Sequence, residues 1–315
     1  MASPLPTARV GRTQLEVTKM GLGTAPLGSL FRPITQEQAE ATIHYALDNG
    51  IRFIDTAPFY GFGQSERYLG AALAQVPRSS FVLSTKVGRL ITPDGRAVFN
   101  FTRDGILRSV EESLQRLKLD YVDILLVHDP DDYYQDAVDF AFPTLAELRS
   151  QGVVKAIGSG MNQWQMLAQF AREADPDCFL LAGRYTLLEQ GAIDEFLPLC
   201  QSKGISVFLG GVYNSGILAR GPRPGAKYNY EDAPPEILAR VQRIAAVCER
   251  FQVPLNVAAL QFPLAHPAVT ALIVGAEEPQ EVEANLNAPG VSIPPAFWSA
   301  LRGEGLLHEA APVPQ

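Results

Sequence analysis

Four side chains capable of proton chemistry end, or closely follow, short apolar segments of this chain: Asp55, Tyr60, Lys86 and His128. A free tyrosine has a pKa of about 10, so it exchanges a proton near neutral pH only beside a cation. Lys86 is such a cation, and we expect it to lower the pKa of Tyr60. A carboxylate, Asp55, could hold the Lys86 ammonium by a charge-assisted hydrogen bond. His128 could orient a carbonyl or hydroxyl oxygen beside the phenol.

Taken singly, each of these residues is compatible with a structural role, but together they predict proton transfer by Tyr60. No side chain supplies a hydride, so oxidation or reduction at such a site implies a nicotinamide cofactor. A Schiff-base lyase with Lys86 as nucleophile is an alternative, which requires Lys86 to lack a carboxylate partner. A module that holds a cofactor without fast turnover is a further alternative.

Such residues need a scaffold that brings separate segments together. Short apolar segments alternate with stretches of helical period, and glycines stand after several of these stretches. Strands that are apolar on both faces and alternate with helices predict a parallel sheet. Eight units predict one (β/α)8 TIM-barrel domain over residues 1–315, with the site at the C-terminal ends of the strands. The predicted strands are 20–24, 51–55, 81–86, 122–128, 154–159, 178–184, 205–210 and 269–275.

Other segments fall outside this repeat. Residues 9–17 are expected to form a β-hairpin that plugs the N-terminal end of the barrel, and 293–303 an accessory C-terminal helix. Two long loops, 129–140 and 211–232, are expected to shape the pocket. A doubly wound dinucleotide fold is the main rival, but the glycines near Gly21 do not complete its phosphate-binding pattern.

Composition limits the partners. The net charge of −8 disfavours binding to nucleic acid or to anionic membranes, and no run of about 20 apolar residues predicts a spanning helix. Three widely spaced cysteines and no secretory signal favour a cytoplasmic protein. The acidic residues beside His128 lack the spacing of a metal site, so we predict no metal. The oligomeric state is left open.

The motifs around the four residues resemble those of the aldo-keto reductase superfamily. Asp55-Thr56-Ala57 with Tyr60-Gly61 and Ser65-Glu66 is similar to its DTAxxYG…SE signature. Ser84-Thr85-Lys86-Val87 and Val127-His128 resemble two further motifs of the family. The sequences around His128-Asp129-Pro130 and Gly158-Ser159-Gly160 resemble the branch of the D-threo-aldose 1-dehydrogenases and L-fucose dehydrogenases.

The resemblance implies that Tyr60 is the general acid/base, that Lys86 and Asp55 tune it, and that His128 orients the substrate. Phe59 and Asp129 are expected to line the substrate pocket with Tyr60 and His128. In an aldose dehydrogenase, Tyr60 would accept the proton of the anomeric hydroxyl while the hydride leaves C1, which gives a lactone. Reduction of small aldehydes or ketones is the alternative reaction.

The resemblance also implies a cofactor site at the strand ends. Gly210 replaces a common aromatic residue that stacks on the nicotinamide, and Arg184 replaces a glutamine. Acidic residues, among them Glu281, stand where members that use NADP carry Arg or Lys, so NAD is favoured over NADP. The predicted cofactor residues are Gly23, Thr24, Asp55, Asn162, Arg184, Gly210, Gly211, Val212, Ser215, Gly275, Ala276, Gln280, Glu281 and Asn285.

Overall fold

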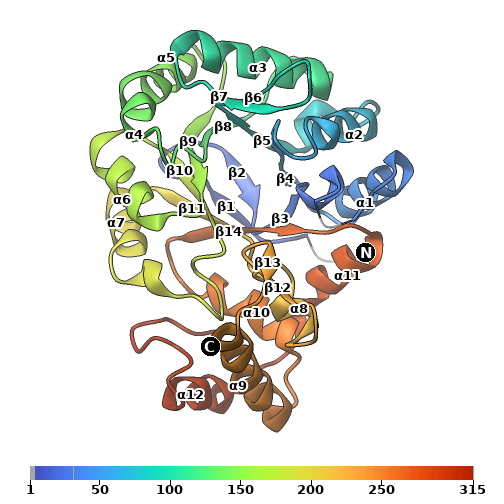
Figure 1. Ribbon diagram of the computed structural model, residues 1–315, viewed down its shortest axis with the longest axis vertical. Coiled ribbons are helices and arrows are strands. Elements are labelled where there is room, and N and C mark those ends of the chain that lie inside the picture. The colour runs from blue at the N-terminus through green and yellow to red at the C-terminus, as the bar shows by residue number, and fades with distance from the viewer. Residues whose placement is uncertain (1–3, 31, 315) are drawn as a thin grey trace.

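A closed barrel of eight parallel strands forms the centre of the molecule, as predicted (Figure 1). The structure is a computed structural model that describes residues 4–30 and 32–314. The strands pair in the order β10-β11-β14-β3-β4-β5-β8-β9 around the ring. They are β3 (Met20–Gly23), β4 (Phe53–Asp55), β5 (Val82–Val87), β8 (Ile124–His128), β9 (Ala156–Met161), β10 (Cys178–Ala182), β11 (Ser206–Gly210) and β14 (Val269–Gly275).

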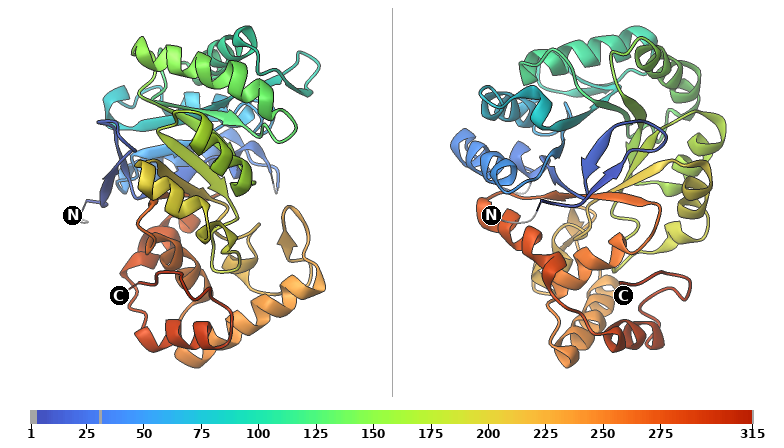
Figure 2. Two further views of the ribbon diagram at one scale, coloured as in Figure 1. Left: turned by 90° about the vertical axis from the view of Figure 1, so that its left-hand side faces the viewer. Right: turned by 180° about the vertical axis from the view of Figure 1, so that it is seen from behind.

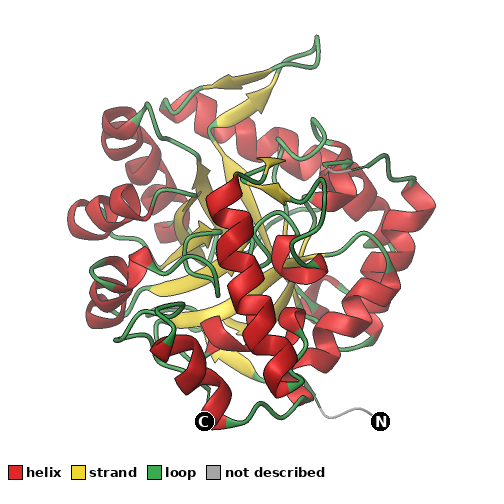
Figure 3. Cartoon of the chain, turned by 60° about the horizontal axis from the view of Figure 1, so that its bottom comes forward, coloured by secondary structure: helices red, strands yellow, loops and turns green. Residues whose placement is uncertain are grey.

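Helices surround the barrel on the outside (Figure 3). Local capping residues set several of their ends; Thr35 and Gln38, for example, form a capping box at the start of α1. The helices are α1 (Gln36–Asp48), α2 (Gln64–Ala72), α3 (Arg103–Leu117), α4 (Tyr134–Asp136), α5 (Phe142–Ser150), α6 (Trp164–Glu173), α7 (Phe196–Lys203), α8 (Ile217–Arg220), α9 (Pro235–Phe251), α10 (Leu255–Leu264), α11 (Pro279–Asn287) and the accessory α12 (Pro295–Gly303).

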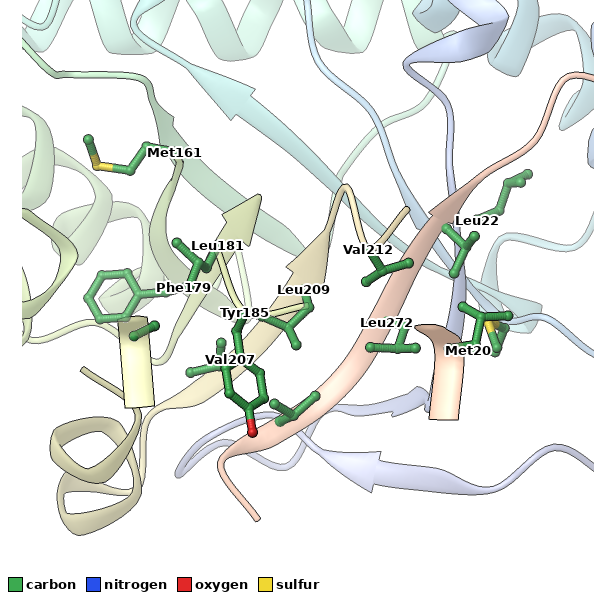
Figure 4. Close-up of a cluster of buried hydrophobic side chains, with 14 of the residues drawn as sticks. Met20, Leu22, Met161, Phe179, Leu181, Tyr185, Val207, Leu209, Val212 and Leu272 are labelled. Atoms are coloured by element: carbon green, nitrogen blue, oxygen red, sulfur yellow. The ribbon is translucent and has the colours of Figure 1, made fainter. Parts of the chain in front are cut away.

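Alternate residues of each strand enter two different cores. On β8, Leu125 and Val127 point outward and pack under the helices, whereas Ile124 and Leu126 point into the barrel. The same alternation on the other strands builds the outer cluster of Figure 4, which includes Phe179, Leu181 and Leu209. Because side chains alternate between the faces of a strand, the register of each strand decides which residues can reach the barrel interior.

The N-terminal end of the barrel is closed by the predicted hairpin, formed by β1 (Thr7–Arg9) and β2 (Glu16–Thr18). It lies across the barrel base when the molecule is seen from behind (Figure 2). Val10, Leu15 and Val17 join the inner core with Phe53 and Phe208. The barrel is therefore filled from below, and open space remains only toward the C-terminal ends of its strands.

The connections at the mouth carry more structure than the sequence indicated. The sequence predicts a loop over residues 129–140, but residues 134–150 form one continuous helical segment. A π-helical stretch, 137–141, joins α4 to α5 within it. A hairpin of β6 (Arg89–Ile91) and β7 (Ala97–Phe99) follows β5 and was not predicted. A second, β12 (Lys227–Tyr228) with β13 (Glu231–Asp232), lies within the long loop after β11. Over the described ranges, no helix is long and apolar enough to span a membrane.

Candidate active site

Strand register places three of the predicted catalytic side chains inside the mouth of the barrel. Ile54 and Val127 belong to the outer core, so the residues that follow them, Asp55 and His128, point inward. Lys86 precedes Val87, another outer-core residue, so the Lys86 side chain also points inward. All three inward side chains are buried. Their convergence follows from neighbouring positions in the barrel, since β4, β5 and β8 are adjacent.

The Lys86 ammonium joins the acid and the phenol. Its Nζ lies 2.7 Å from Oδ2 of Asp55, 2.9 Å from the Tyr60 hydroxyl and 3.0 Å from the carbonyl oxygen of Thr56. The second oxygen of Asp55 accepts a 2.7 Å hydrogen bond from Ser84. All three N–H groups of the ammonium are thus engaged. A Lys86 held in this way is poorly suited to attack a carbonyl, which argues against the Schiff-base alternative.

The pKa of Tyr60 differs from the sequence-based expectation. Burial raises the pKa of this phenol to about 12, although the charge of Lys86 opposes the increase. Burial is the largest effect, and the Asp55 carboxylate, which also disfavours a phenolate, acts in the same direction. Burial disfavours charge on Lys86 as well, but Asp55 and Tyr60 outweigh it and raise the pKa of the ammonium. Without further charge in the site, Tyr60 is therefore a neutral proton donor.

Tight backbone packing holds Tyr60 in position. Gly61 has a φ of 61°, and a Cβ at this residue would lie 2.4 Å from the carbonyl oxygen of Gly28. Only glycine fits such an approach in a left-handed conformation. On the opposite side, a Cβ at Gly160 would lie 3.3 Å from Cε of Lys86, so this glycine leaves room for the lysine stem. Both glycines serve the geometry of the Lys86–Tyr60 contact.

His128 completes the floor of the site as a neutral imidazole. Burial, and then the charges of Lys86 and Arg89, hold its pKa well below the usual value. Its ring lies 6.0 Å from that of Tyr60, centroid to centroid, at 89°. Nδ1 is buried and has no hydrogen-bond partner among the described residues. The other ring nitrogen, Nε2, lies 3.6 Å from Oδ2 of Asp129, which lines the cavity.

A cavity of about 550 Å³ opens over these residues. Phe59 and Asp129, both expected in the substrate pocket, line it. Arg89 connects them: its guanidinium carbon lies 3.3 Å from the Phe59 ring centroid, and its Nη1 lies 3.0 Å from Oδ2 of Asp129. Burial raises the pKa of Asp129 to about 6, and Arg89 limits the increase. Asp129 is thus a carboxylate at neutral pH whose charge is sensitive to mild acid.

The Ser65-Glu66 part of the signature supports the site from below. Ser65 donates a 2.7 Å hydrogen bond to the Thr24 hydroxyl, and Thr24 donates to the carbonyl oxygen of Asp55. Glu66 is buried and accepts hydrogen bonds from Thr85 and Arg116. These contacts fasten α2 to β3, β5 and α3. Thr24, predicted to bind the cofactor, has its side chain committed to this framework.

The structure separates the predicted cofactor residues into two groups. Asn162 lines the cavity, next to the small inward residues Gly160 and Ala182. Gly23 and Gly210 occupy inward strand-end positions, where a Cβ at Gly23 would lie 3.0 Å from Ile273 and one at Gly210 would lie 3.3 Å from Leu180. Asn162 is thus the predicted cofactor residue that faces this cavity.

Other predicted cofactor residues lie away from the cavity floor. The Val212 side chain is buried in the outer core (Figure 4), so only its backbone could face a ligand. Arg184 donates to Asn229, and Ser215 accepts from the Tyr230 N–H, so both hold the β12–β13 hairpin. Gly211 turns the chain with a φ of 59°. The hairpin contacts of Arg184 were not foreseen.

The residues predicted to hold the adenosine end lie at the end of β14 and along α11. Asn285 accepts a 2.8 Å hydrogen bond from Tyr213, which joins α11 to the loop after β11. Glu281 accepts from the backbone N–H of Glu277 and lies 3.9 Å from Arg220. The remaining members of this group, Gly275, Ala276 and Gln280, lie between β14 and the first turn of α11. Glu277 itself forms an ion pair with Arg32.

Two pocket residues were not assigned from the sequence. Arg89 is the first residue of β6, so its contact with both Phe59 and Asp129 depends on the β6–β7 hairpin. Tyr230 lines the cavity from the tip of the β12–β13 hairpin. No periodic pattern in the loop 211–232 indicates this position. Across residues 4–30 and 32–314, no group of three or more His, Cys, Asp or Glu side chains is placed to hold a metal.

Comparisons with known proteins agree with this geometry. The family model described as "Aldo/keto reductase family" matches residues 19–303. The chain is 42% identical to a pyridoxal 4-dehydrogenase of Microbacterium luteolum, over 95% of this chain and 97% of that protein. It is 41% identical to a D-threo-aldose 1-dehydrogenase of a Pseudomonas species, over 93% and 95% of the two chains.

A solved structure shares the whole architecture. The holo form of an aldo-keto reductase from Bacillus halodurans superimposes with a TM-score of 0.81 at 26% identity, and the match covers 98% of each chain. The family match over most of the chain, the two relatives and this structure agree on the barrel fold and on the family. This chain belongs to the aldo/keto reductase family, whose members are oxidoreductases that use nicotinamide cofactors.

Proposed function

We propose that this protein oxidises the cyclic hemiacetal of an aldose at C1 to the lactone, with NAD as hydride acceptor. The observation that carries the proposal is the Lys86 ammonium, 2.7 Å from Asp55 and 2.9 Å from Tyr60 at the floor of a cavity. The nicotinamide cofactor, when bound, supplies the hydride acceptor and a positive charge. A screen of L-fucose, D-arabinose, L-galactose and simple aldehydes with NAD and NADP, followed by absorbance of the reduced nicotinamide, tests it.

In the proposed reaction, Tyr60 accepts the proton of the anomeric hydroxyl as hydride leaves C1. His128 binds the same oxygen and orients it toward the phenol. Lys86 stabilises the phenolate that must form first, and Asp55 keeps the ammonium in place. In the reverse direction, the neutral phenol donates its proton to the carbonyl oxygen. The raised pKa of Tyr60 suits this donor role directly.

The relatives support a hemiacetal as substrate. Aldoses and pyridoxal differ in carbon skeleton, but each has an aldehyde with a hydroxyl group in reach, so each can close to a cyclic hemiacetal. Two relatives above 40% identity carry these substrates in their names. Pyridoxal is therefore a second candidate substrate, favoured by the aromatic walls Phe59, Phe99 and Tyr133 of the cavity. Comparing pyridoxal with the aldoses in one assay decides between them.

We propose NAD as the cofactor because the adenosine end is acidic. Glu277 is buried and paired with Arg32, and Glu278 lies 3.6 Å from the same guanidinium. Glu281 stands one turn further on, half exposed. A 2′-phosphate dianion placed near these carboxylates would be repelled, whereas ribose hydroxyls can donate to them.

Glu281→Arg is expected to lower the Kd for NADP at least about tenfold, because it replaces a repelling charge with an attracting one. Isothermal titration with NAD and NADP measures the change. Glu283→Arg is the matched control, since this residue is exposed on the same helix. An unchanged NADP affinity in Glu281→Arg, or an equal gain in the control, would show that the adenosine site lies elsewhere.

Asp129 predicts a pH dependence of substrate binding. Its pKa is about 6, so the carboxylate that accepts hydrogen bonds from sugar hydroxyls is lost as the pH falls through 6. KM for an aldose is expected to rise about tenfold between pH 7 and pH 5, with a smaller effect on kcat. Asp129→Asn should give the high KM at both values.

Asp136→Asn, an exposed acid on α4, is the control for this dependence and should keep the wild-type profile. A wild-type KM that is constant from pH 7 to pH 5, or one that changes equally in Asp129→Asn, would remove Asp129 from aldose binding.

A further inference from the structure

Exposed apolar side chains surround the mouth of the cavity. Leu30, Phe99, Tyr133 and Tyr230 all line it, and they are 47%, 38%, 36% and 58% exposed. They come from four different connections, those after β3, within the β6–β7 hairpin, after β8 and within the β12–β13 hairpin. Large apolar groups left exposed around a cavity are typical of a surface that a ligand covers.

Tyr230 occupies its place on this rim despite an unfavourable backbone. Asn229 and Tyr230 form the two-residue turn of the β12–β13 hairpin, with φ values of 49° and 68°. Turns of this kind prefer Asn followed by Gly, because a left-handed conformation is unfavourable for a bulky residue. An aromatic side chain at the second position is therefore not explained by the turn itself.

Contacts from the connection after β10 and from the start of its own loop hold the hairpin over the barrel. The Tyr230 N–H donates a 3.0 Å hydrogen bond to Ser215, and Arg184 donates a 3.0 Å hydrogen bond to Asn229. Tyr228 donates to Glu189. These anchors use backbone groups or the side chains of neighbouring residues. They fix the turn so that the Tyr230 ring is presented to the cavity.

We propose that Tyr230 is a specificity-determining residue that contacts the part of the substrate farthest from the reacting carbon. This inference rests on the proposed function and deepens it. Lys86 and His128 are buried at the floor beside the half-buried Tyr60, whereas Tyr230 is at the exposed rim. A ligand that contacts both must extend from floor to rim, and we expect a ring-sized hemiacetal to do so and a two-carbon aldehyde to contact the floor alone.

The chemistry of the side chain fits a polyhydroxylated or aromatic ring. Its π-face packs on sugar C–H groups or on a flat heterocycle. A tyrosine hydroxyl is protonated near neutral pH, so that of Tyr230 can donate to a substrate oxygen. Tyr230 would thus recognise substrates by size and ring character, with no part in proton transfer.

Tyr230→Gly is the informative variant, because glycine accepts the left-handed conformation and removes the ring. Its melting temperature is expected to be no lower than that of the wild type, which separates recognition from folding. We expect kcat/KM for D-arabinose oxidation to fall at least about tenfold, mainly through KM. Reduction of glycolaldehyde should change less than about threefold. Tyr230→Phe keeps the ring and then measures how much the hydroxyl contributes to kcat/KM for D-arabinose.

Lys227→Ala is the matched control, since it breaks only the exposed ion pair with Asp232 on the same hairpin. Equal changes for D-arabinose and glycolaldehyde in Tyr230→Gly would overturn the proposal. If the wild type oxidises no aldose and no pyridoxal, the proposed function fails. In that case, kcat/KM for reduction of 4-nitrobenzaldehyde is compared with that for glycolaldehyde, a large substrate with a small one. Equal losses of kcat/KM for the two in Tyr230→Gly would again overturn the role of Tyr230.

Discussion

Tyr60→Phe is expected to lower kcat for hydride transfer by about 10²–10⁴-fold in both directions, because it removes the group that exchanges the proton. The ring that packs beside His128 is retained, and only the hydroxyl bonded to Lys86 is lost. The Kd for NAD should therefore stay within a few-fold of the wild-type value. Single-turnover measurement of nicotinamide absorbance, with cofactor titration on the same sample, checks both statements.

A comparison of the pH profiles of the wild type and Tyr60→Phe gives an independent check. Tyr60 is protonated at neutral pH since its pKa is raised to about 12, and oxidation needs the deprotonated form. Oxidation by the wild type should accelerate as the pH rises from 7 to 10, because the phenolate fraction grows. The positive charge of the bound cofactor shifts the curve to lower pH. Normal turnover in Tyr60→Phe, or the same alkaline slope, would exclude Tyr60 as the acid/base.

Lys86→Met is the second substitution with a large expected effect, since it changes both activity and stability. The side chains of Lys86 and Asp55 are 2% and 3% exposed, so the pair is withdrawn from water. Removal of the ammonium leaves the Asp55 carboxylate buried without its partner, which costs about 3–5 kcal/mol. Loss of the charge beside Tyr60 should also reduce kcat by at least about 10³-fold. Chemical denaturation and steady-state kinetics measure the two losses.

The double variant Asp55→Asn/Lys86→Met separates these two effects. With both charges removed, no buried ion remains unpaired, so most of the lost free energy of unfolding should return. Activity should stay as low as in Lys86→Met, because the phenol still lacks its cation. Recovery of activity together with stability would mean that Lys86 acts only as a structural partner of Asp55.

The sequence alone was sufficient for the scaffold and for the four central residues. Eight apolar segments alternating with helical ones predicted the barrel, which the observed strands confirm. Because side chains alternate along a strand, Asp55, Lys86 and His128 share the inward face as a consequence of local order. The motifs at those strand ends likewise predicted the family to which the chain belongs.

The rim of the pocket could not be obtained in this way. Arg89 reaches Phe59 and Asp129 from the β6–β7 hairpin, and Tyr230 reaches the cavity from an Asn-Tyr turn in a loop without periodicity. Loop conformation depends on long-range anchors such as Arg184 with Asn229, and single side chains in a sequence do not indicate such partners.

The pKa of Tyr60 shows most clearly what only the tertiary structure decided. The sequence determined that a phenol, an ammonium and a carboxylate would meet, which indicated a lowered pKa. The folded chain buries the pair of Lys86 and Asp55 and partly encloses Tyr60, so desolvation outweighs the attraction of the cation and the pKa of Tyr60 rises. Residue type and spacing fix which charges are present, whereas their exposure to water depends on every segment that closes over them.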